Sequence, residues 1–455
     1  MSPVLKSMTE KRALPRNWML AIATLQGLAL FALYKSVETD SWPSDAPLWS
    51  FPLWTLAIIL PVVVLLSLDR GNQRRVALLT AAFAAVLVFV AVYTGYQATP
   101  VDAFSINALT GVFALSVAIA SYKVLMYLQQ RASDLPLSYQ VLFTFSWRNF
   151  LVTALGGLFV LAFWAVLALW GALFEVIEID FFAELFSEDW FRFPVLSFAF
   201  GLGVVIFREL TRVIDNIAGL LRGLIKLLLP VVVLVATLFL LALPVTGLSV
   251  LWATGRGTSL LLWLTALTLF FVNAVYQDGR DESPYPAVIH RLVYAGLLTL
   301  LPVSAISLYG LVLRIDQYGL SVQRSWAVVV WSLLTLFALG YAWGILRRRD
   351  AWPETLARVN TGMGWVMLAI LLLANSPLLD FRKLAVRSQL ARVEAGLIER
   401  SELDFYYFSN SLARPGYLAL EQIKLEIGDS DPALLARIEN PVPSAAARMV
   451  QTPAE

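Results

Sequence analysis

Eleven long apolar runs, separated by short polar segments, make up most of the chain. Most of the runs have the roughly 17–25 residues that a helix needs to cross about 30 Å of hydrocarbon. Helices are the expected form because backbone groups in lipid must form their hydrogen bonds within the segment. The pattern therefore predicts an all-α, polytopic transmembrane helix bundle. The predicted spans are Trp18–Tyr34, Phe51–Leu68, Val76–Tyr96, Phe104–Leu128, Phe150–Leu173, Phe193–Phe207, Leu227–Val245, Ser259–Tyr276, Leu292–Leu313, Trp326–Leu346 and Val359–Leu379.

Basic residues alternate between the two sides of this bundle. Six segments together carry 19 Lys and Arg residues: 1–17, 69–75, 129–149, 208–226, 277–291 and 346–358. The segments between them carry only five: 35–50, 97–103, 174–192, 246–258 and 314–325. The positive-inside rule places the basic segments and the N-terminus in the cytoplasm, and eleven crossings place the C-terminus outside. The short sixth run is counted as a crossing because the alternation is lost without it.

The composition agrees with a membrane protein and excludes several kinds of chemistry. Hydrophobic residues make up 59% of the chain and charged residues 15%, against about 45–50% and about 25% in soluble domains. The chain has no Cys and one His, His290. A thiol nucleophile, an iron–sulfur cluster and a Cys-rich zinc site are therefore excluded. No phosphate-binding loop is present, so we expect no metal, no cofactor and no nucleic-acid partner.

The charges also divide the chain into regions. Residues 1–17 form a cytoplasmic tail, with the first span read as an uncleaved anchor, and residues 18–379 form the bundle. Residues 380–440 are predicted to be a helical region on the outer side, with helices beginning near Pro415 and at Asp431-Pro432. Residues 441–455 are expected to be disordered.

One cytoplasmic segment, 208–226, has the spacing of an amphipathic interfacial helix. Its basic face is predicted to contact membrane lipids. The residues assigned to this membrane surface are Arg208, Arg212, Arg222 and Lys226.

Ionisable residues are nearly absent from the spans, which argues against a carboxylate-driven pump. Lys123 is the exception, within snorkelling reach of the cytoplasmic end. The neutral polar residues Gln26, Asn273, Asn360 and Asn375 are expected to form interhelical hydrogen bonds, with substrate contact as the alternative. Gly201-x-Gly203 is expected to allow close helix packing.

Three stretches near the C-terminus resemble a bacterial family of multi-pass inner-membrane proteins known only as a domain of unknown function. They are Leu313–Leu320 followed by Arg324, Trp352-Pro353 running to Asp380 and Arg387-Ser388-Gln389, and Leu412–Glu421. The resemblance is clearest over the last third of the chain. It implies the same membrane topology in the inner membrane and no assigned activity.

The same stretches bring charged residues to the outer surface. Two interpretations stay open: an anionic lipid or glycan ligand held by arginine forks, or a network that docks the C-terminal helices on the bundle. With Tyr318-Gly319 as a turn, the candidate ligand-binding residues are Arg314, Asp316, Tyr318, Arg324, Asp380 and Arg387.

The first functional hypothesis is transport-like handling of a lipid-linked or small amphipathic molecule. The alternatives are a membrane-embedded transferase or hydrolase that uses outer carboxylates, or a scaffold or sensor that binds an envelope protein through the C-terminal region. The carboxylates considered are Glu184, Glu188 and Asp380. No residue is assigned a catalytic role.

Overall fold

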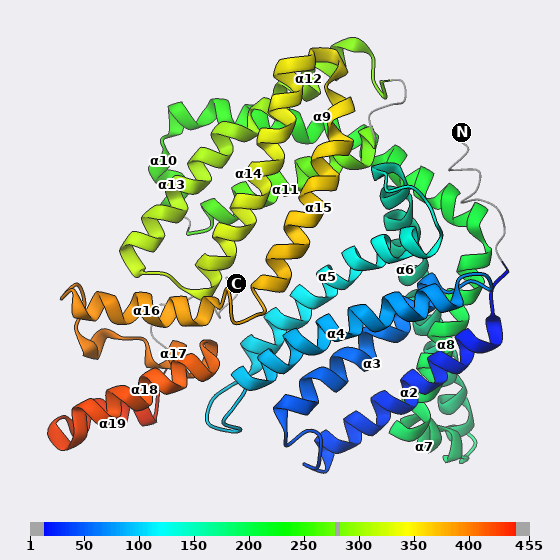
Figure 1. The fold of residues 1–455 in the computed structure, drawn as a ribbon, viewed down its shortest axis with the longest axis horizontal. Coiled ribbons are helices and arrows are strands. Elements are labelled where there is room, and N and C mark those ends of the chain that lie inside the picture. The colour runs from blue at the N-terminus through cyan, green and yellow to red at the C-terminus, as the bar shows by residue number, and fades with distance from the viewer. Residues whose placement is uncertain (1–12, 254, 278–282, 443–455) are drawn as a thin grey trace. The chain divides into compact units, whose positions relative to one another are not determined.

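The computed structural model describes residues 13–253, 255–277 and 283–442, and within them every regular element is a helix (Figure 1). This confirms the predicted all-α class. Residues 443–455 of the tail predicted at 441–455, and most of the N-terminal tail, lie outside the described residues. The helices are α2 (Arg16–Glu38), α3 (Pro47–Ser67), α4 (Gln73–Gln97), α5 (Asn107–Ala132), α6 (Tyr139–Glu175), α7 (Phe181–Ser187), α8 (Asp189–Glu209), α9 (Thr211–Thr246), α10 (Leu248–Ala253), α11 (Gly257–Tyr276), α12 (Ala287–Leu298), α13 (Leu300–Tyr318), α14 (Val322–Arg348), η1 (Arg349–Thr355), α15 (Leu356–Leu373), α16 (Phe381–Glu394), η2 (Arg400–Glu402), α17 (Phe405–Ser411), α18 (Ala413–Ile427), η3 (Gly428–Ser430) and α19 (Pro432–Glu439).

Among the described residues, ten helical stretches are long and apolar enough to cross a membrane. One of them, Val322–Leu373, contains both α14 and α15, which the sequence pattern counts as two runs. Another, Ala287–Tyr318, joins α12 and α13 into the predicted ninth run. The apolar helices therefore correspond to the predicted runs, and the count of ten or eleven depends on whether α14 and α15 are separated.

Two boundaries differ from the prediction. The segment 208–226 is not a separate helix, because α8 ends at Glu209 and α9 continues unbroken from Thr211 to Thr246. Arg208 therefore lies in the last turn of α8, away from the helix that carries Arg212. The apolar run that begins at Leu227 follows Lys226 directly, with no turn residue between them to end a helix, which explains the continuous α9.

The chain forms two compact units. Unit 1 contains residues 1–92 and 118–227, and unit 2 contains residues 93–117 and 228–455. Helices α4, α5 and α9 are each divided, with one part in unit 1 and the other part in unit 2.

Unit 1 depends on close packing of small residues. A Cβ atom added to Gly201 of α8 would lie 2.4 Å from the Cβ of Ala23 in α2, and one added to Gly27 would lie 2.5 Å from the Cα of Pro194. Gly203 similarly faces Gly156 of α6, at 3.2 Å for an added Cβ. These positions let helix backbones approach closely, as in many membrane bundles, and confirm the packing role expected for Gly201 and Gly203.

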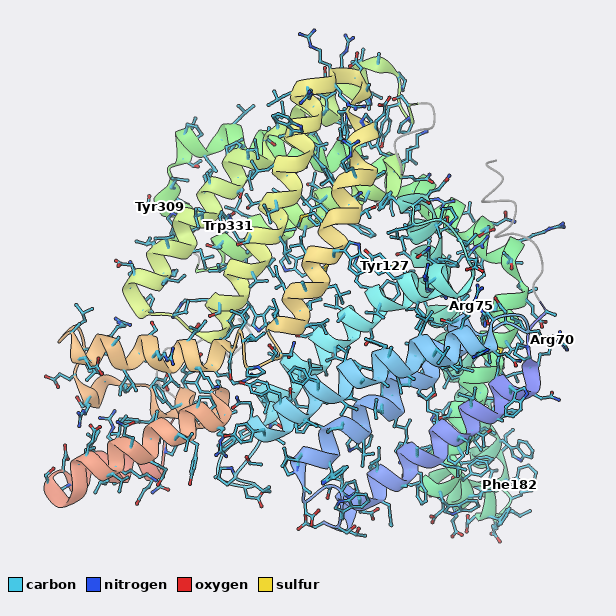
Figure 2. The ribbon with its side chains drawn as sticks, viewed as in Figure 1. Arg70, Arg75, Tyr127, Phe182, Tyr309 and Trp331 are labelled. Carbon is cyan, nitrogen blue, oxygen red and sulfur yellow. The ribbon has the colours of Figure 1, made fainter. Side chains whose placement is uncertain are left out.

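The two ends of unit 1 differ in chemistry (Figure 2). Arg70 and Arg75 lie at one end and Phe182 lies at the other. At the first end the backbone N–H of Arg70 donates to the carbonyl of Ala13 at 3.0 Å. Helix α8 runs from one end to the other, with the ring of Phe193 5.1 Å from that of Tyr34 near its start. The sixth apolar run thus lies within a continuous helix of 21 residues.

Unit 2 contains a polar contact between three apolar helices. The hydroxyl of Tyr341 in α14 lies 2.9 Å from the side-chain oxygen of Asn273 in α11 and 2.5 Å from that of Asn360 in α15, and it shares its single proton between them. Asn360 also donates to Asn273. This is the interhelical hydrogen bonding expected of these two asparagines.

The C-terminal helices of unit 2 build a small core of their own, which includes Phe381, Phe405, Phe408, Leu420 and Ile423. Residues of α14 pack against the same core, so the region docks on the end of that helix. Helix α18 includes Pro415 in its first turn, and Asp431 caps α19 by accepting from the N–H of Leu434 at 3.0 Å. Both predicted helix starts are confirmed.

Candidate functional site

A pocket of about 460 Å³ opens at the basic end of unit 1. Pockets that hold small ligands typically enclose about 300–1,000 Å³ and combine apolar walls with a few polar groups. The wall of this pocket has that composition, with apolar side chains from α3, α6, α8 and α9. Its lining residues are Ala13, Leu14, Arg16, Leu66, Asp69, Gln129, Ser133, Leu135, Phe145, Arg148, Asn149, Val152, Phe207, Arg208, Glu209, Thr211 and Ile214.

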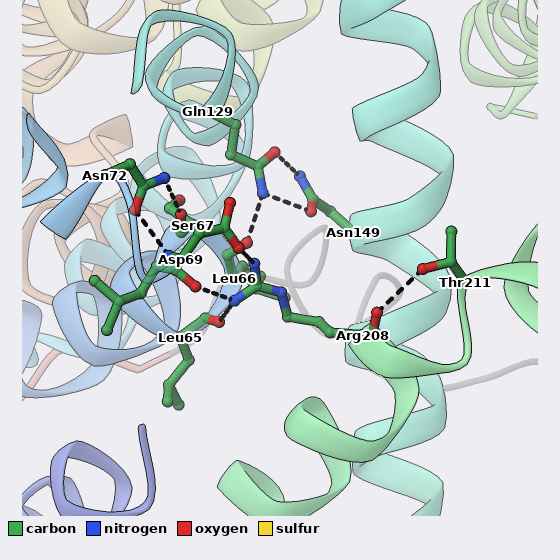
Figure 3. A network of polar contacts seen from close by, with 10 residues as sticks. Leu65, Leu66, Ser67, Asp69, Asn72, Gln129, Asn149, Arg208 and Thr211 are labelled. Carbon is green, nitrogen blue, oxygen red and sulfur yellow. Dashed lines mark hydrogen bonds and ion pairs between the residues drawn. The ribbon is translucent and has the colours of Figure 1, made fainter. Parts of the chain in front are cut away.

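Arg208 fixes one side of the pocket (Figure 3). Its guanidinium donates to the carbonyl oxygens of Leu65 and Leu68 at 2.7 and 2.8 Å, and to the carboxylate of Asp69 at 2.9 Å. The two carbonyls belong to the end of α3, where helix geometry leaves them without backbone partners. Arg208 therefore ties the end of α8 to the end of α3 by charge-assisted hydrogen bonds.

A pair of amides forms the second side. Gln129 of α5 donates to the side-chain oxygen of Asn149 in α6 at 2.9 Å, and Asn149 donates back at 2.7 Å. Gln129 also donates to the carbonyl of Leu66 at 2.9 Å. Both side chains are buried, and each satisfies the other, which removes the penalty for an unpaired polar group.

Two ion pairs join helices around the opening, one between α2 and α8 and one between α6 and α9. Arg16 donates twice to Glu209, at 2.7 and 2.6 Å. Arg148 donates twice to Asp215, at 3.0 and 2.8 Å. Such two-point Arg–carboxylate pairs fix both distance and orientation. Arg16 and Glu209 are partly exposed, so the mouth presents both a cation and an anion.

The sequence did not identify this pocket. Gln129 and Asn149 stand immediately outside the apolar runs that end at Leu128 and begin at Phe150, so both were treated as loop residues. In the structure α5 continues to Ala132 and α6 begins at Tyr139, which places both amides on facing helices. An amide side chain directly beside an apolar run, after it for Gln129 and before it for Asn149, is the signal that would have located them.

The residues assigned to the membrane surface separate into two groups. Arg208 is engaged inside unit 1, as described above. Arg212 and Lys226 are exposed and Arg222 is half-buried, all three on α9. Their contact with lipid remains a prediction.

The residues predicted to bind a ligand on the outer side also have different surroundings in the structure. Arg314 and Arg324 both lie over the ring of Tyr318, with guanidinium carbons 5.8 and 5.4 Å from its centroid. Arg324 also donates to the carbonyl of Gly319 at 2.7 Å. Arg387 and Asp316 are exposed. Asp380 is buried and faces α4, where it accepts from Tyr93 and Gln97.

The turn after α13 confirms the role predicted for Gly319, whose φ is +71°. A Cβ atom there would lie 2.7 Å from Nε2 of Gln389. Gln389 donates to the carbonyls of Tyr318 and Leu320 at 3.0 and 3.2 Å, and Arg392 donates to that of Gln317 at 2.8 Å. Helix α16 therefore docks on the end of α13 mainly through side chains that satisfy its terminal carbonyls.

The carboxylates considered for catalysis are divided between the units, with Glu184 and Glu188 in unit 1 and Asp380 in unit 2. Glu184 lies in α7 and Glu188 lies between α7 and α8, and both are exposed. Within the described part of the chain, no group of three or more His, Asp or Glu side chains is placed to hold a metal ion.

A family model described as a domain of unknown function (DUF4153) matches residues 23–423. The chain belongs to this family. The match covers most of the chain, whereas the residues quoted from the sequence suggested it for the last third only. No curated protein and no solved structure matches the chain.

Proposed function

We propose that this DUF4153 protein is a multi-pass protein of the bacterial inner membrane that binds the polar head of an amphipathic molecule in the pocket of unit 1. The pocket is the observation that carries the proposal. It joins an apolar wall, which includes Leu66 and Val152, to a polar edge with Arg16 and Glu209. A molecule with an apolar chain and a head that both donates and accepts hydrogen bonds matches these two surfaces.

The proposed orientation puts this pocket at the cytoplasmic surface. The segments that line its mouth are those rich in Lys and Arg: the N-terminal segment, the turn after α3 and the segments that follow α5 and α8. The positive-inside rule supports a cytoplasmic position for them. The C-terminal region is correspondingly proposed to lie outside. Binding of the polar head group of a lipid-linked molecule in a pocket at the cytoplasmic surface is compatible with transport-like handling of that molecule.

The test compares co-purifying molecules between two tryptophan variants. Ser133→Trp adds an indole at the pocket, whereas Leu161→Trp places one on an exposed side of α6, where Leu161 is 67% exposed. The full chain is purified in mild detergent, and bound amphipathic molecules are extracted and identified by mass spectrometry. We expect a specific molecule in the wild type and in Leu161→Trp and its depletion in Ser133→Trp. Equal amounts in all three proteins would contradict the proposal.

A second candidate function is recruitment of an envelope protein. Leu418 and Leu425 of α18 are 50% and 85% exposed, and their spacing of seven residues places them on one side of the helix. Such a side fits the face of a partner helix. Replacing both residues by Ser should abolish crosslinking to a partner in cells while leaving the protein level unchanged. Unchanged crosslinking would exclude this surface.

A further inference from the structure

Arg382, in the first turn of α16, is buried without a hydrogen-bond partner for its side chain among the described residues. It is 9% exposed, and its Nε atom is fully buried and unpartnered. Its backbone N–H donates to Asp380 at 2.9 Å, and no ion pair between the two side chains is found among the described residues. A buried guanidinium normally has a carboxylate or several carbonyls around it, because a desolvated charge without partners is costly.

The neighbouring carboxylate is already engaged. Asp380 accepts from the hydroxyl of Tyr93 at 2.6 Å and from Nε2 of Gln97 at 2.8 Å through one oxygen. Its other oxygen caps α16 through the N–H of Arg382. Burial lowers the pKa of the Arg382 guanidinium, and the charge of Asp380 acts in the opposite direction. Asp380 therefore offsets the charge of Arg382 only from a distance.

Gln97, which also contacts Asp380, has a buried polar atom without a hydrogen-bond partner in the described part of the chain. Its Nε2 donates to Tyr93 at 2.6 Å and to Asp380, which fixes the orientation of the amide. Its Oε1 is then a buried acceptor without a partner. An unpartnered donor and an unpartnered acceptor thus border the same carboxylate.

The surroundings are cationic and aromatic. The ammonium of Lys383 lies 5.8 Å from the centre of the Tyr93 ring, and the guanidinium carbon of Arg414 lies 4.5 Å from that of Tyr96. Lys383 is exposed, so the site borders the surface of unit 2. Tyrosines with Lys and Arg at a helix end are typical of the level of lipid head groups.

We propose that Arg382 binds a phosphate group whose ligand also carries a hydrogen-bond donor for Gln97. The planar guanidinium matches two phosphate oxygens, and a hydroxyl of the same ligand satisfies Oε1 of Gln97. A glycerophospholipid with a hydroxylated head group meets both requirements, and so does free phosphate carrying one proton. This site lies in unit 2 and is independent of the pocket proposed for unit 1.

The experiment measures binding of three probes to the full chain in detergent by native mass spectrometry. The probes are dihexanoyl phosphatidylglycerol, dihexanoyl phosphatidylcholine, which lacks a donor in its head group, and inorganic phosphate. The variants are Arg382→Gln and Arg382→Lys, and the control is Arg387→Gln, an exposed arginine on the same helix.

We expect saturable binding of phosphatidylglycerol that is stronger than that of phosphatidylcholine. Arg382→Gln should weaken it by about tenfold or more, the effect of losing a charge-assisted hydrogen bond, and Arg387→Gln should leave it unchanged. If the wild type binds inorganic phosphate and Arg382→Gln does not, the result would support the same site with free phosphate as its ligand. If Arg382→Gln does not fold, Arg382→Lys decides, because it keeps the charge and loses the fork.

Two results would overturn the proposal. One is that the wild type binds none of the three probes. The other is that a folded Arg382 variant binds them as tightly as the wild type does.

Discussion

Two arginines in this protein, the half-buried Arg208 and the buried Arg382, differ sharply in what surrounds them. Arg208 in unit 1 donates to two helix-terminal carbonyls and to a carboxylate, all within 2.9 Å. Arg382 in unit 2 is 9% exposed, and its guanidinium has no such partner among the described residues. Burial alone therefore does not distinguish a structural arginine from a ligand-binding one.

The difference lies in the acceptors that each fold supplies. The end of α3 turns its free carbonyls and Asp69 toward Arg208, so the charge is satisfied within the protein. At the start of α16 the carboxylate of Asp380 is taken up by Tyr93, Gln97 and the backbone. The proposed phosphate would supply the acceptor that Arg382 lacks, which is why we assign a structural role to Arg208 and propose a binding role for Arg382.

Arg208→Met should produce the largest effect. Removing Arg208 leaves Asp69 and the end of α3 without their buried partner, and breaking a buried pair typically costs about 3–5 kcal/mol. The free energy of unfolding is measured by titration with a denaturing detergent. Adding Asp69→Leu to Arg208→Met should recover part of the loss, because the carboxylate whose charge Arg208 offsets is then removed as well. A loss of stability below about 1 kcal/mol for the single variant would contradict a structural role for Arg208.

Gln129→Leu should have the next largest effect. It leaves the side chain of Asn149 without the reciprocal amide, and an unsatisfied buried polar group costs about 1–3 kcal/mol. The same unfolding measurement applies. The double variant Gln129→Leu with Asn149→Leu should be closer to the wild type than Gln129→Leu alone, and a further loss would show that the pair is not the relevant interaction.

Tyr407→Phe tests the surroundings of Arg382. The hydroxyl of Tyr407 accepts from the N–H of Val322 at 2.9 Å, and burial raises the pKa of this hydroxyl. Losing the bond should cost about 1 kcal/mol and make residues 381–440 more sensitive to limited proteolysis. Tyr406→Phe is the matched control. Identical digestion rates for the two variants would contradict a docking role for Tyr407.

Arg382→Met should have the smallest effect on stability. Without phosphate or phospholipid, it removes a buried charge that has no close partner, so we expect a change of less than about 1 kcal/mol or a slight gain. The measurement is unfolding in phosphate-free detergent. A loss as large as that of Arg208→Met would show that Arg382 has internal partners after all.

The apolar runs predicted the helices well because lipid imposes a simple requirement on length and polarity. Charged segments between them also predicted the grouping of basic residues seen at the end of unit 1. The pocket was not predictable in this way, because Gln129 and Asn149 are 20 residues apart on two different helices. Their pairing depends on how these helices pack. The sequence does not single out Arg382, because its burial and the engagement of Asp380 are properties of the folded chain.

The most direct test of the central claim is the accessibility of a cysteine placed in the pocket of unit 1. The natural chain has no Cys, so Ser133→Cys provides a single thiol at the pocket lining. Labelling by a membrane-impermeant maleimide is followed in inside-out and right-side-out vesicles, before and after extraction of bound amphipathic molecules. We predict labelling only in inside-out vesicles, with a faster rate after extraction. Labelling from the outer side, or a rate that extraction does not change, would contradict a cytoplasmic pocket occupied by an amphipathic ligand.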